Sequence, residues 1–436
     1  MLPLLALTAC QWLHEDRPPD VVIVVVDTLR ADGPGYAGNP RPTTPHLDAL
    51  ASKEATWFSH ASAGSCWTLP STTTLLTGIY PWQHRVIRML RDKDLYGRLD
   101  PAVPTLGSAF RERGYRTAAF VNNAFLAPEF GLNRHFDLYN YEGANSNNHR
   151  AAAETVRQAL EWLDASTTSS LLIVHMMEPH SEYLAPAPFR GQFTEGLPHT
   201  LPPPPYGPEQ LQAWMSRKEV PSLEDQAYVH AAYDEEILAV DDAIGQLIAG
   251  LQARDRWDNA VFVVTADHGE EFWDNGGYEH GHTTRSVLTH VPLVIKAPGY
   301  LPGRNDTIVD HVDLYQALVS NSGVIPEVAR TGEYRRGEFA FAEDLLYGPQ
   351  EVTAANEDLR LIIHLATKDA ELWTLNDRWE EVEALHTQPD RREAARGPLD
   401  ALLKVRGNLE PTEPNNPTEI QSAETFDMLR KLGYIE

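Results

Sequence analysis

The chain has 436 residues, and its 36 lysines and arginines stand against 62 aspartates and glutamates, which gives a formal net charge of −26. This acidic balance excludes a nucleic-acid-binding protein, because such proteins neutralise phosphates with clustered lysines and arginines. Aromatic residues make up 9% of the chain, so it has the apolar surface that disordered proteins lack. We therefore expect a folded acidic protein that binds no nucleic acid.

The N-terminal residues Met1–Cys10 are apolar, end in small residues and are too short to span a bilayer as a helix. Leu7-Thr8-Ala9-Cys10 is similar to the lipobox of a bacterial lipoprotein, whose cysteine becomes the lipidated N-terminus. We therefore predict a lipoprotein-like signal and tether over residues 1–19, lipidation at Cys10, and a location in the cell envelope outside the cytoplasm. Membrane contact is expected only through this anchor. The alternative is an N-terminus without targeting meaning, since a basic segment is missing.

Apolar patterning predicts alternating strands and helices from about residue 20 to 325. The β-branched run Val21–Val26 is typical of a strand buried on both faces of a parallel sheet. Further strands are expected at residues 117–121, 171–175, 260–265 and 292–295, and helices at 105–113, 151–163 and 233–251. The alternation predicts an α/β fold with a large, mixed, mostly parallel sheet between helices.

The remaining segments are expected to lie outside this sheet. The proline-rich stretch 184–221 predicts a long surface loop. Residues 336–436 are expected to form a smaller C-terminal α+β subdomain packed on a catalytic domain of residues 20–335. Within it we predict a hairpin of strands 359–364 and 371–375, a solvated helical surface over 377–396 and a terminal helix over 424–432.

Polar side chains follow two of the predicted strands directly. Asp27, Arg30 and Asp32 follow the first strand, and Asp267 and His268 follow the strand at 260–265. Open α/β sheets bind their ligands at the carboxyl ends of the strands. Carboxylates and imidazoles that meet there suit a divalent cation, although a strand-end cap is the simpler interpretation of Asp27 alone.

A second kind of cluster is the hydroxyl-rich segment Thr68–Thr72. Pro70 suits the first turn of a helix whose N-terminus points at Thr68. Such an N-terminus favours a bound anion, and a hydroxyl beside a metal can attack a tetrahedral anionic centre. The pattern indicates phosphoryl or sulfuryl transfer, with a plain helix cap at Thr68 as the alternative.

Four motifs occur in a characteristic order along the chain. They are Val26–Asp32, Thr68–Pro81, Thr265–Glu270 and Val291–Ile295. In this order the chain resembles the sulfatase branch of the alkaline phosphatase superfamily, over roughly residues 20–436. The resemblance implies an alkaline-phosphatase-like fold. It also implies one divalent ion, Zn²⁺, Mn²⁺ or Ca²⁺, with these ligands: Asp27, Thr68, Asp267 and His268.

The nucleophile position departs from the sulfatase pattern. Sulfate-ester enzymes of the family have cysteine, or less often serine, within Cys-x-Pro-x-Arg and oxidise it to formylglycine. Here Thr68 occupies that position and Thr72 replaces the arginine, while Cys66 lies two residues too early to serve the motif. Threonine at this position is similar to the nucleophile of phosphodiesterases and of phosphoethanolamine and phosphoglycerol transferases. We therefore expect an enzyme without formylglycine.

The predicted function is a metal-dependent, sulfatase-like hydrolase that cleaves sulfate or phosphate esters through a covalent intermediate on Thr68. Three histidines are expected to bind ester oxygens or to protonate the leaving group, namely His180, His280 and His282. Arg30 and Asp32 are expected to orient Asp27 without binding the metal themselves. The alternative interpretation of these three histidines is that they lie in solvated loops without a catalytic role.

The expected substrate is an anionic ester of a small molecule, a lipid or a glycan. Two alternatives remain open at this point. One is a transferase of the phosphoethanolamine or phosphoglycerol type. The other is a catalytically inactive, lipid-anchored homologue that binds anions.

Overall fold

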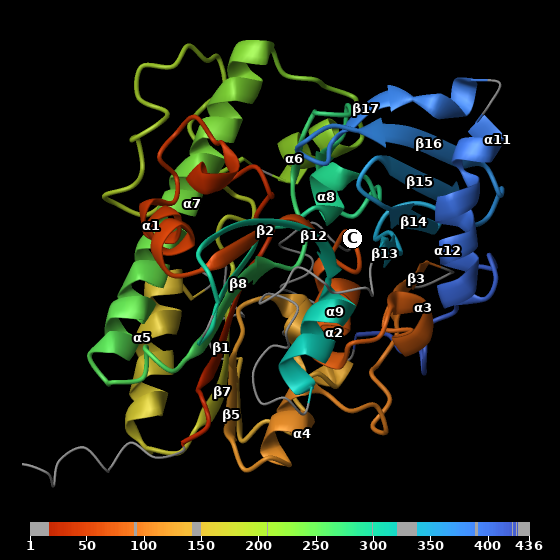
Figure 1. Ribbon diagram of the computed structural model, residues 1–436. Coiled ribbons are helices and arrows are strands. Elements are labelled where there is room, and N and C mark those ends of the chain that lie inside the picture. The colour runs from red at the N-terminus through yellow and green to blue at the C-terminus, as the bar shows by residue number, and fades with distance from the viewer. Residues whose placement is uncertain are drawn as a thin grey trace, which may run out of the picture.

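The computed structural model describes residues 17–90, 94–141, 150–206, 208–298, 300–320, 338–388 and 391–420, together with 422, 423 and 425. A large sheet lies between two layers of helices, and a second, antiparallel sheet lies to one side of it (Figure 1). The predicted α/β fold with a C-terminal β-containing part is therefore confirmed.

The large sheet has eight strands in the order β12-β2-β11-β8-β1-β7-β5-β6. Their bounds are β1 (Val21–Val26), β2 (Thr56–Ser62), β5 (Arg116–Phe120), β6 (Leu138–Asn140), β7 (Ser170–Met176), β8 (Val261–Ala266), β11 (Leu293–Lys296) and β12 (Gly303–Asp310). Neighbouring strands are parallel, except that β11 runs antiparallel to both β8 and β2. The central strands β1, β7 and β8 therefore end at one edge.

Side chains of β1 alternate between two hydrophobic cores, one on each face of the sheet. Val21, Ile23 and Val25 pack into the core that contains residues of α2 (Thr68–Thr77), α4 (Leu106–Arg111) and α9 (His311–Val319). Val22, Val24 and Val26 pack against α1 (Pro45–Lys53), α5 (Ala152–Asp164) and α7 (Leu223–Gln252). The β-branched run is thus buried on both faces, as its sequence predicts.

Two elements differ from the sequence-based expectations. Helix α7 begins at Leu223, ten residues before the predicted start, because Ser222 caps it by accepting a hydrogen bond from the Asp225 amide. The stretch 184–221 is not a continuous loop, since α6 (Pro208–Met215) lies within it. Trp214 of α6 is buried against Trp273, so the segment is packed despite its many prolines.

The second sheet has five antiparallel strands in sequence order, which include the predicted hairpin of β15 and β16. The strands are β13 (Ala340–Glu343), β14 (Glu351–Ala355), β15 (Leu359–His364), β16 (Ala370–Leu375) and β17 (Glu381–Ala384), followed by η4 (Leu385–Thr387), α11 (Arg391–Ala394) and α12 (Arg396–Arg406). Helix α12 packs on β14 and β15. The predicted helical surface over 377–396 is wrong where β17 continues the sheet.

The shorter elements connect these layers. They are η1 (Gly35–Ala37), α3 (Pro81–His84), β3 (Arg88–Leu90), β4 (Asp94–Tyr96), η2 (Ala124–Leu126), η3 (Pro128–Phe130), β9 (Glu271–Phe272), β10 (Tyr278–Glu279) and α8 (Ser286–Thr289). No helix within the described ranges has both the length and the apolar character needed to cross a membrane.

Three sequence-based predictions fall outside the described residues. They are the lipidation of Cys10, the domain boundary at residue 335 and nearly all of the terminal helix expected over 424–432. The lipid anchor, the envelope location and the domain limits therefore stay predictions.

A buried ion pair attaches α12 to the second sheet. Arg406 Nε lies 2.7 Å from Glu343 Oε2, and the two side chains are 3% and 0% exposed. Thr412 Oγ1 also donates to this carboxylate. Loss of the guanidinium would leave a buried carboxylate without its charge partner.

We predict that Arg406→Met lowers the free energy of unfolding by about 3–5 kcal/mol, the usual effect of removing one partner of a buried ion pair. Urea unfolding followed by tryptophan fluorescence measures the change. Arg392→Met is the matched control, because Arg392 lies exposed on α11 and should change stability by no more than about 0.5 kcal/mol. A loss below about 1 kcal/mol for Arg406→Met would contradict the assigned role of the pair.

Candidate active site and metal centre

Two aspartates lie fully buried at the ends of neighbouring strands. Asp27 follows β1, Asp267 follows β8, and both are 0% exposed. Burial and the nearby charge of Asp267 raise the pKa of Asp27 well above its ordinary value, and burial raises the pKa of Asp267 to about 7. Asp27 Oδ1 and Asp267 Oδ2 have no hydrogen-bond partner among the described residues. These oxygens therefore fit the ligand atoms of a cation that keeps both carboxylates ionised.

Two buried imidazoles complete the group around these oxygens. His268 Nε2 lies 3.6 Å from Asp27 Oδ1 and 3.7 Å from Asp267 Oδ2. His175 Nε2 lies 3.5 Å from Asp27 Oδ2, and its ring nitrogens have no hydrogen-bond partner in the described part of the chain. Ligand atoms of Asp27, His175 and Asp267 lie within 4.8 Å of one another.

Both imidazoles are suited to metal binding in their neutral form. Burial lowers the pKa of His175 to about 3 and lowers that of His268 well below its ordinary value. A neutral ring offers a nitrogen lone pair to a cation. From the sequence alone His175 has no assigned role, because its position at the end of the predicted strand 171–175 does not show toward which face the ring turns.

Thr68 is the first residue of α2, and its hydroxyl lies beside the metal-binding group. Thr68 Oγ1 is 3.3 Å from His268 Nε2 and 3.3 Å from Asn123 Nδ2. The cap position is occupied by Trp67, which makes no side-chain capping bond, and Pro70 lies in the first turn as expected. Thr68 is therefore not a plain helix cap, and the N-terminal amides of α2 point toward the same space.

Asn123 is a site residue that the sequence reasoning missed. Its amide nitrogen donates to Asp27 Oδ2 at 2.6 Å and to Thr68 Oγ1 at 3.3 Å. Its amide oxygen accepts a hydrogen bond from the Phe125 backbone at 2.9 Å, which fixes the orientation of the side chain. The available signal was an Asn-Asn pair at the end of β5, since polar residues there reach the same sheet edge.

Three of the predicted histidines form one wall of the site. The His280 ring lies 4.5 Å from the His268 ring and 5.0 Å from the His180 ring, measured between centroids. His280 Nδ1 is 2.8 Å from Glu270 Oε1, so a buried carboxyl group orients this imidazole. Burial lowers the pKa of His280 to about 3 and raises that of Glu270 to about 8.

His282 has a different position from the one expected. Its Nε2 lies 2.7 Å from Glu271 Oε2, and the other oxygen of Glu271 accepts backbone hydrogen bonds from Asn275 and Gly277. The structure thus places His282 three residues after β10, where its pairing with Glu271 of β9 holds the β9–β10 hairpin that precedes His280.

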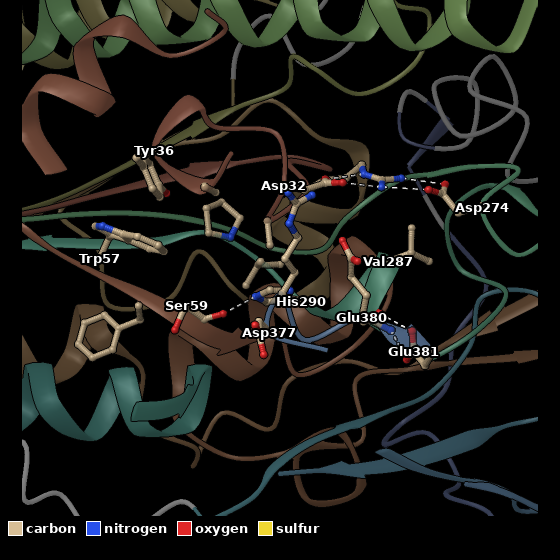
Figure 2. A pocket seen from close by; sticks show the side chains of 18 of the residues that line it. Asp32, Tyr36, Trp57, Ser59, Asp274, Val287, His290, Asp377, Glu380 and Glu381 are labelled. Atoms are coloured by element: carbon tan, nitrogen blue, oxygen red, sulfur yellow. Dashed lines mark hydrogen bonds and ion pairs between the residues drawn. The ribbon is translucent and has the colours of Figure 1, made fainter. Parts of the chain in front are cut away.

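Arg30 lies between the carboxylates of Asp32 and Asp274, both of which are labelled in Figure 2. Its guanidinium donates to Asp32, to Asp274 and to the backbone carbonyl of Glu270 at distances of 2.8–3.1 Å. Asp27 is not among these partners. Arg30 and Asp32 therefore connect the loop after β1 to the loop after β8, and their predicted support of Asp27 is indirect.

Comparisons with known proteins show the family to which the chain belongs. A family model described as Sulfatase matches residues 19–324. The uncharacterized sulfatase YidJ of Escherichia coli (strain K12) is 25% identical over 70% of this chain and 68% of its own length. The phosphoethanolamine transferase EptC of Escherichia coli O18:K1:H7 (strain RS218 / NMEC) is 24% identical over 64% of this chain and 45% of its own length.

A solved structure of phosphonate monoester hydrolase from Agrobacterium radiobacter superposes with a TM-score of 0.70, 19% identity and coverage of 93% of this chain and 100% of that chain. At this level of identity the superposition shows a shared fold. The family model covers more than two thirds of the sequence and includes all the residues of the site described above. The chain therefore belongs to the sulfatase family.

Proposed function

We propose that the protein cleaves phosphate or sulfate esters through a covalent intermediate on Thr68. The observation that carries the proposal is the position of Thr68 Oγ1, which lies at a helix N-terminus, 3.3 Å from His268 Nε2 and beside two buried carboxylates. A hydroxyl in this position combines a nucleophile, an anion-binding helix end and a cation site within one cluster of side chains.

The donor set fits one divalent cation. Asp27, Asp267, His268 and His175 would hold it, with Thr68 Oγ next to them. Such a cation supplies positive charge that lowers the pKa of the Thr68 hydroxyl and neutralises ester oxygens. Ca²⁺ prefers oxygen ligands, whereas two imidazoles favour a borderline metal, so we propose Zn²⁺ or Mn²⁺ over Ca²⁺.

In the proposed reaction each residue of the site has its own role. Thr68 Oγ forms a bond to phosphorus or sulfur, while the bond to the leaving alcohol breaks. The proton that the Thr68 hydroxyl loses passes to the neutral imidazole of His280 or His180, which gives it to the alcohol oxygen. Asn123 and the N-terminal amides of α2 bind the remaining ester oxygens, and water then hydrolyses the threonine ester and restores the hydroxyl.

The proposal does not require formylglycine. Cys66 is buried, its thiol donates to the Asp344 carbonyl at 3.3 Å, and burial raises its pKa well above the ordinary value. A thiol in this state is inert. Thr68 therefore acts as the unmodified nucleophile.

A transferase is the second candidate, favoured by the similarity to EptC. In that case the group on Thr68 passes to an acceptor alcohol instead of water. Supplying an acceptor such as glycerol with a phosphodiester substrate distinguishes the two, because transfer yields a new ester and hydrolysis yields an acid.

We predict that turnover of one class among aryl sulfates, phosphate monoesters and phosphodiesters falls about 10³-fold or more in Thr68→Ala, because the nucleophile is lost. Thr68→Ser keeps a hydroxyl and should retain turnover. Release of the aryl alcohol is measured with Zn²⁺, Mn²⁺ or Ca²⁺ supplied in turn. Thr77→Ala, the same substitution at the other end of α2, is the matched control and should leave kcat unchanged.

Undiminished turnover in Thr68→Ala would exclude the nucleophile. An absence of turnover in the wild-type protein with all three metals and all three ester classes would favour the inactive, anion-binding homologue.

We also predict that Zn²⁺ or Mn²⁺ raises the melting temperature of chelator-treated protein. A ligand that binds only the folded state, at a concentration of 100 times its Kd, raises the free energy of unfolding by about 2.7 kcal/mol. Asp267→Asn should abolish this rise. Asp241→Asn is the control, because Asp241 is a similarly buried carboxylate whose oxygens accept hydrogen bonds from the His46 and Leu47 amides at the start of α1. An equal metal-induced rise in Asp267→Asn would place the cation elsewhere.

A further inference from the structure

A second cavity lies beside the site, between the large sheet and the turn that joins β16 to β17. Its volume is about 320 Å³, which lies at the lower end of the range for ligand pockets. We call it the lateral pocket; the residues that define it are Tyr36, Trp57, Ser59, His290, Asp377 and Arg378. All of them except Arg378 are labelled in Figure 2. Thr68 and the metal-binding residues do not line it.

Two aromatic rings form one wall of the lateral pocket. Alternation along β2 places Trp57 and Ser59 on its half-buried face, while Phe58 is buried. The Tyr36 and Trp57 rings lie 5.1 Å apart between centroids at an interplanar angle of 50°. This wall offers apolar ring surface to a ligand.

Most charges at the border of the pocket are already paired. Arg30 is held by Asp32 and Asp274, as described above. Glu381 binds the Ser286 amide at 2.8 Å and the Arg360 guanidinium at 2.9 Å. These groups shape the pocket, and their charges are compensated by their neighbours.

Three other polar groups are able to meet a ligand. Asp377 and Arg378 are exposed, and within the described ranges their side chains form no ion pair or hydrogen bond. Arg378 Nη2 lies 3.8 Å from the point where a Cβ would stand on Gly38, so this side chain reaches the opposite rim. His290 Nε2 donates to the Ser59 carbonyl at 2.9 Å, which leaves Nδ1 with a lone pair that can accept.

The lateral pocket thus combines a donor, two acceptors and aromatic surface. The carboxylate of Glu380 also lines it and accepts a hydrogen bond from the Asn376 side-chain amide at 2.8 Å, so charges of both signs border the pocket. An anion would be repelled by the carboxylates of Asp377 and Glu380, and an organic cation would be repelled by the guanidinium of Arg378 and would find no closed aromatic cage. A sugar ring has hydroxyls that donate and accept, together with C–H faces that pack on aromatic rings. We propose that the lateral pocket binds a neutral saccharide unit.

The lateral pocket is linked to the candidate active site through one side chain. Arg30 lines the pocket and donates to the carbonyl of Glu270, whose carboxyl group orients His280. The proposal rests on the pocket residues alone and does not depend on the reaction at Thr68. A saccharide-binding function is therefore testable even if no ester is cleaved.

Saturation-transfer NMR on the full chain tests the proposal with cellobiose, lactose and maltose at millimolar concentration, and with choline chloride and methyl sulfate as charged probes. We expect transfer to at least one disaccharide, reduced at least fivefold in Arg378→Ala and in Trp57→Ala. Arg378 lies on an exposed turn, so this variant should fold even if Trp57→Ala does not. Arg392→Ala, an exposed arginine outside the pocket, should bind as the wild type does.

Aryl ester turnover, where present, should be unchanged in Arg378→Ala, which separates the pocket from the reaction at Thr68. Disaccharide binding that is equal in the wild-type and Arg378→Ala proteins would overturn the proposal, as would the absence of transfer to all three disaccharides. Binding of choline or methyl sulfate that is lost in Arg378→Ala, without disaccharide binding, would assign a charged ligand instead.

Discussion

The close burial of two like charges at neighbouring strand ends determines how the candidate active site is built. Asp27 and Asp267 are fully buried, and removing a carboxylate from water costs several kcal/mol even after relaxation. No arginine or lysine in the described part of the chain pairs with either carboxylate. A bound cation is the simplest way to compensate both charges. The neutral rings of His175 and His268 then act as further ligands without adding to the repulsion.

The overall charge of −26 affects how the site can bind an anionic substrate. Most of the 62 acidic residues cannot lie near one site, so they form a negative exterior that repels anionic substrates. An anionic ester therefore needs a positive site within this field. In the proposed function, a bound cation would reverse the sign of the charge where Thr68 lies, together with the N-terminus of α2 and the Asn123 amide.

Much of this centre follows from the sequence, because the carboxyl ends of parallel strands meet at one edge. Asp27, Asp267 and His268 each follow a strand directly, and Pro70 marks the helix that begins at Thr68. His175 and Asn123 were missed for physical reasons. His175 lies inside a strand, where the pleat and the pairing of Val25 with His175 decide which way the ring turns. Asn123 depends on a short 3₁₀ turn for its orientation.

The features that arise from tertiary packing could not be predicted from the sequence. The lateral pocket joins Trp57 of β2 to Arg378 of the β16–β17 turn, and the charged stretch around Arg378 had been interpreted as a helical surface. Charge and polarity alone do not distinguish an exposed helix from a strand and turn that pack on another sheet. His282 shows a similar difficulty, since its pairing with Glu271 arises from a hairpin that the sequence pattern did not reveal.

The most direct test of the central claim is to trap the intermediate. The metal-loaded protein is mixed with a sulfate or phosphate ester, quenched in acid within the first turnovers, digested and analysed by mass spectrometry. The account predicts one added sulfuryl or phosphoryl group on the peptide that contains Thr68, localised to that residue. Turnover with a modification on another residue, or with none at any quench time, would contradict it.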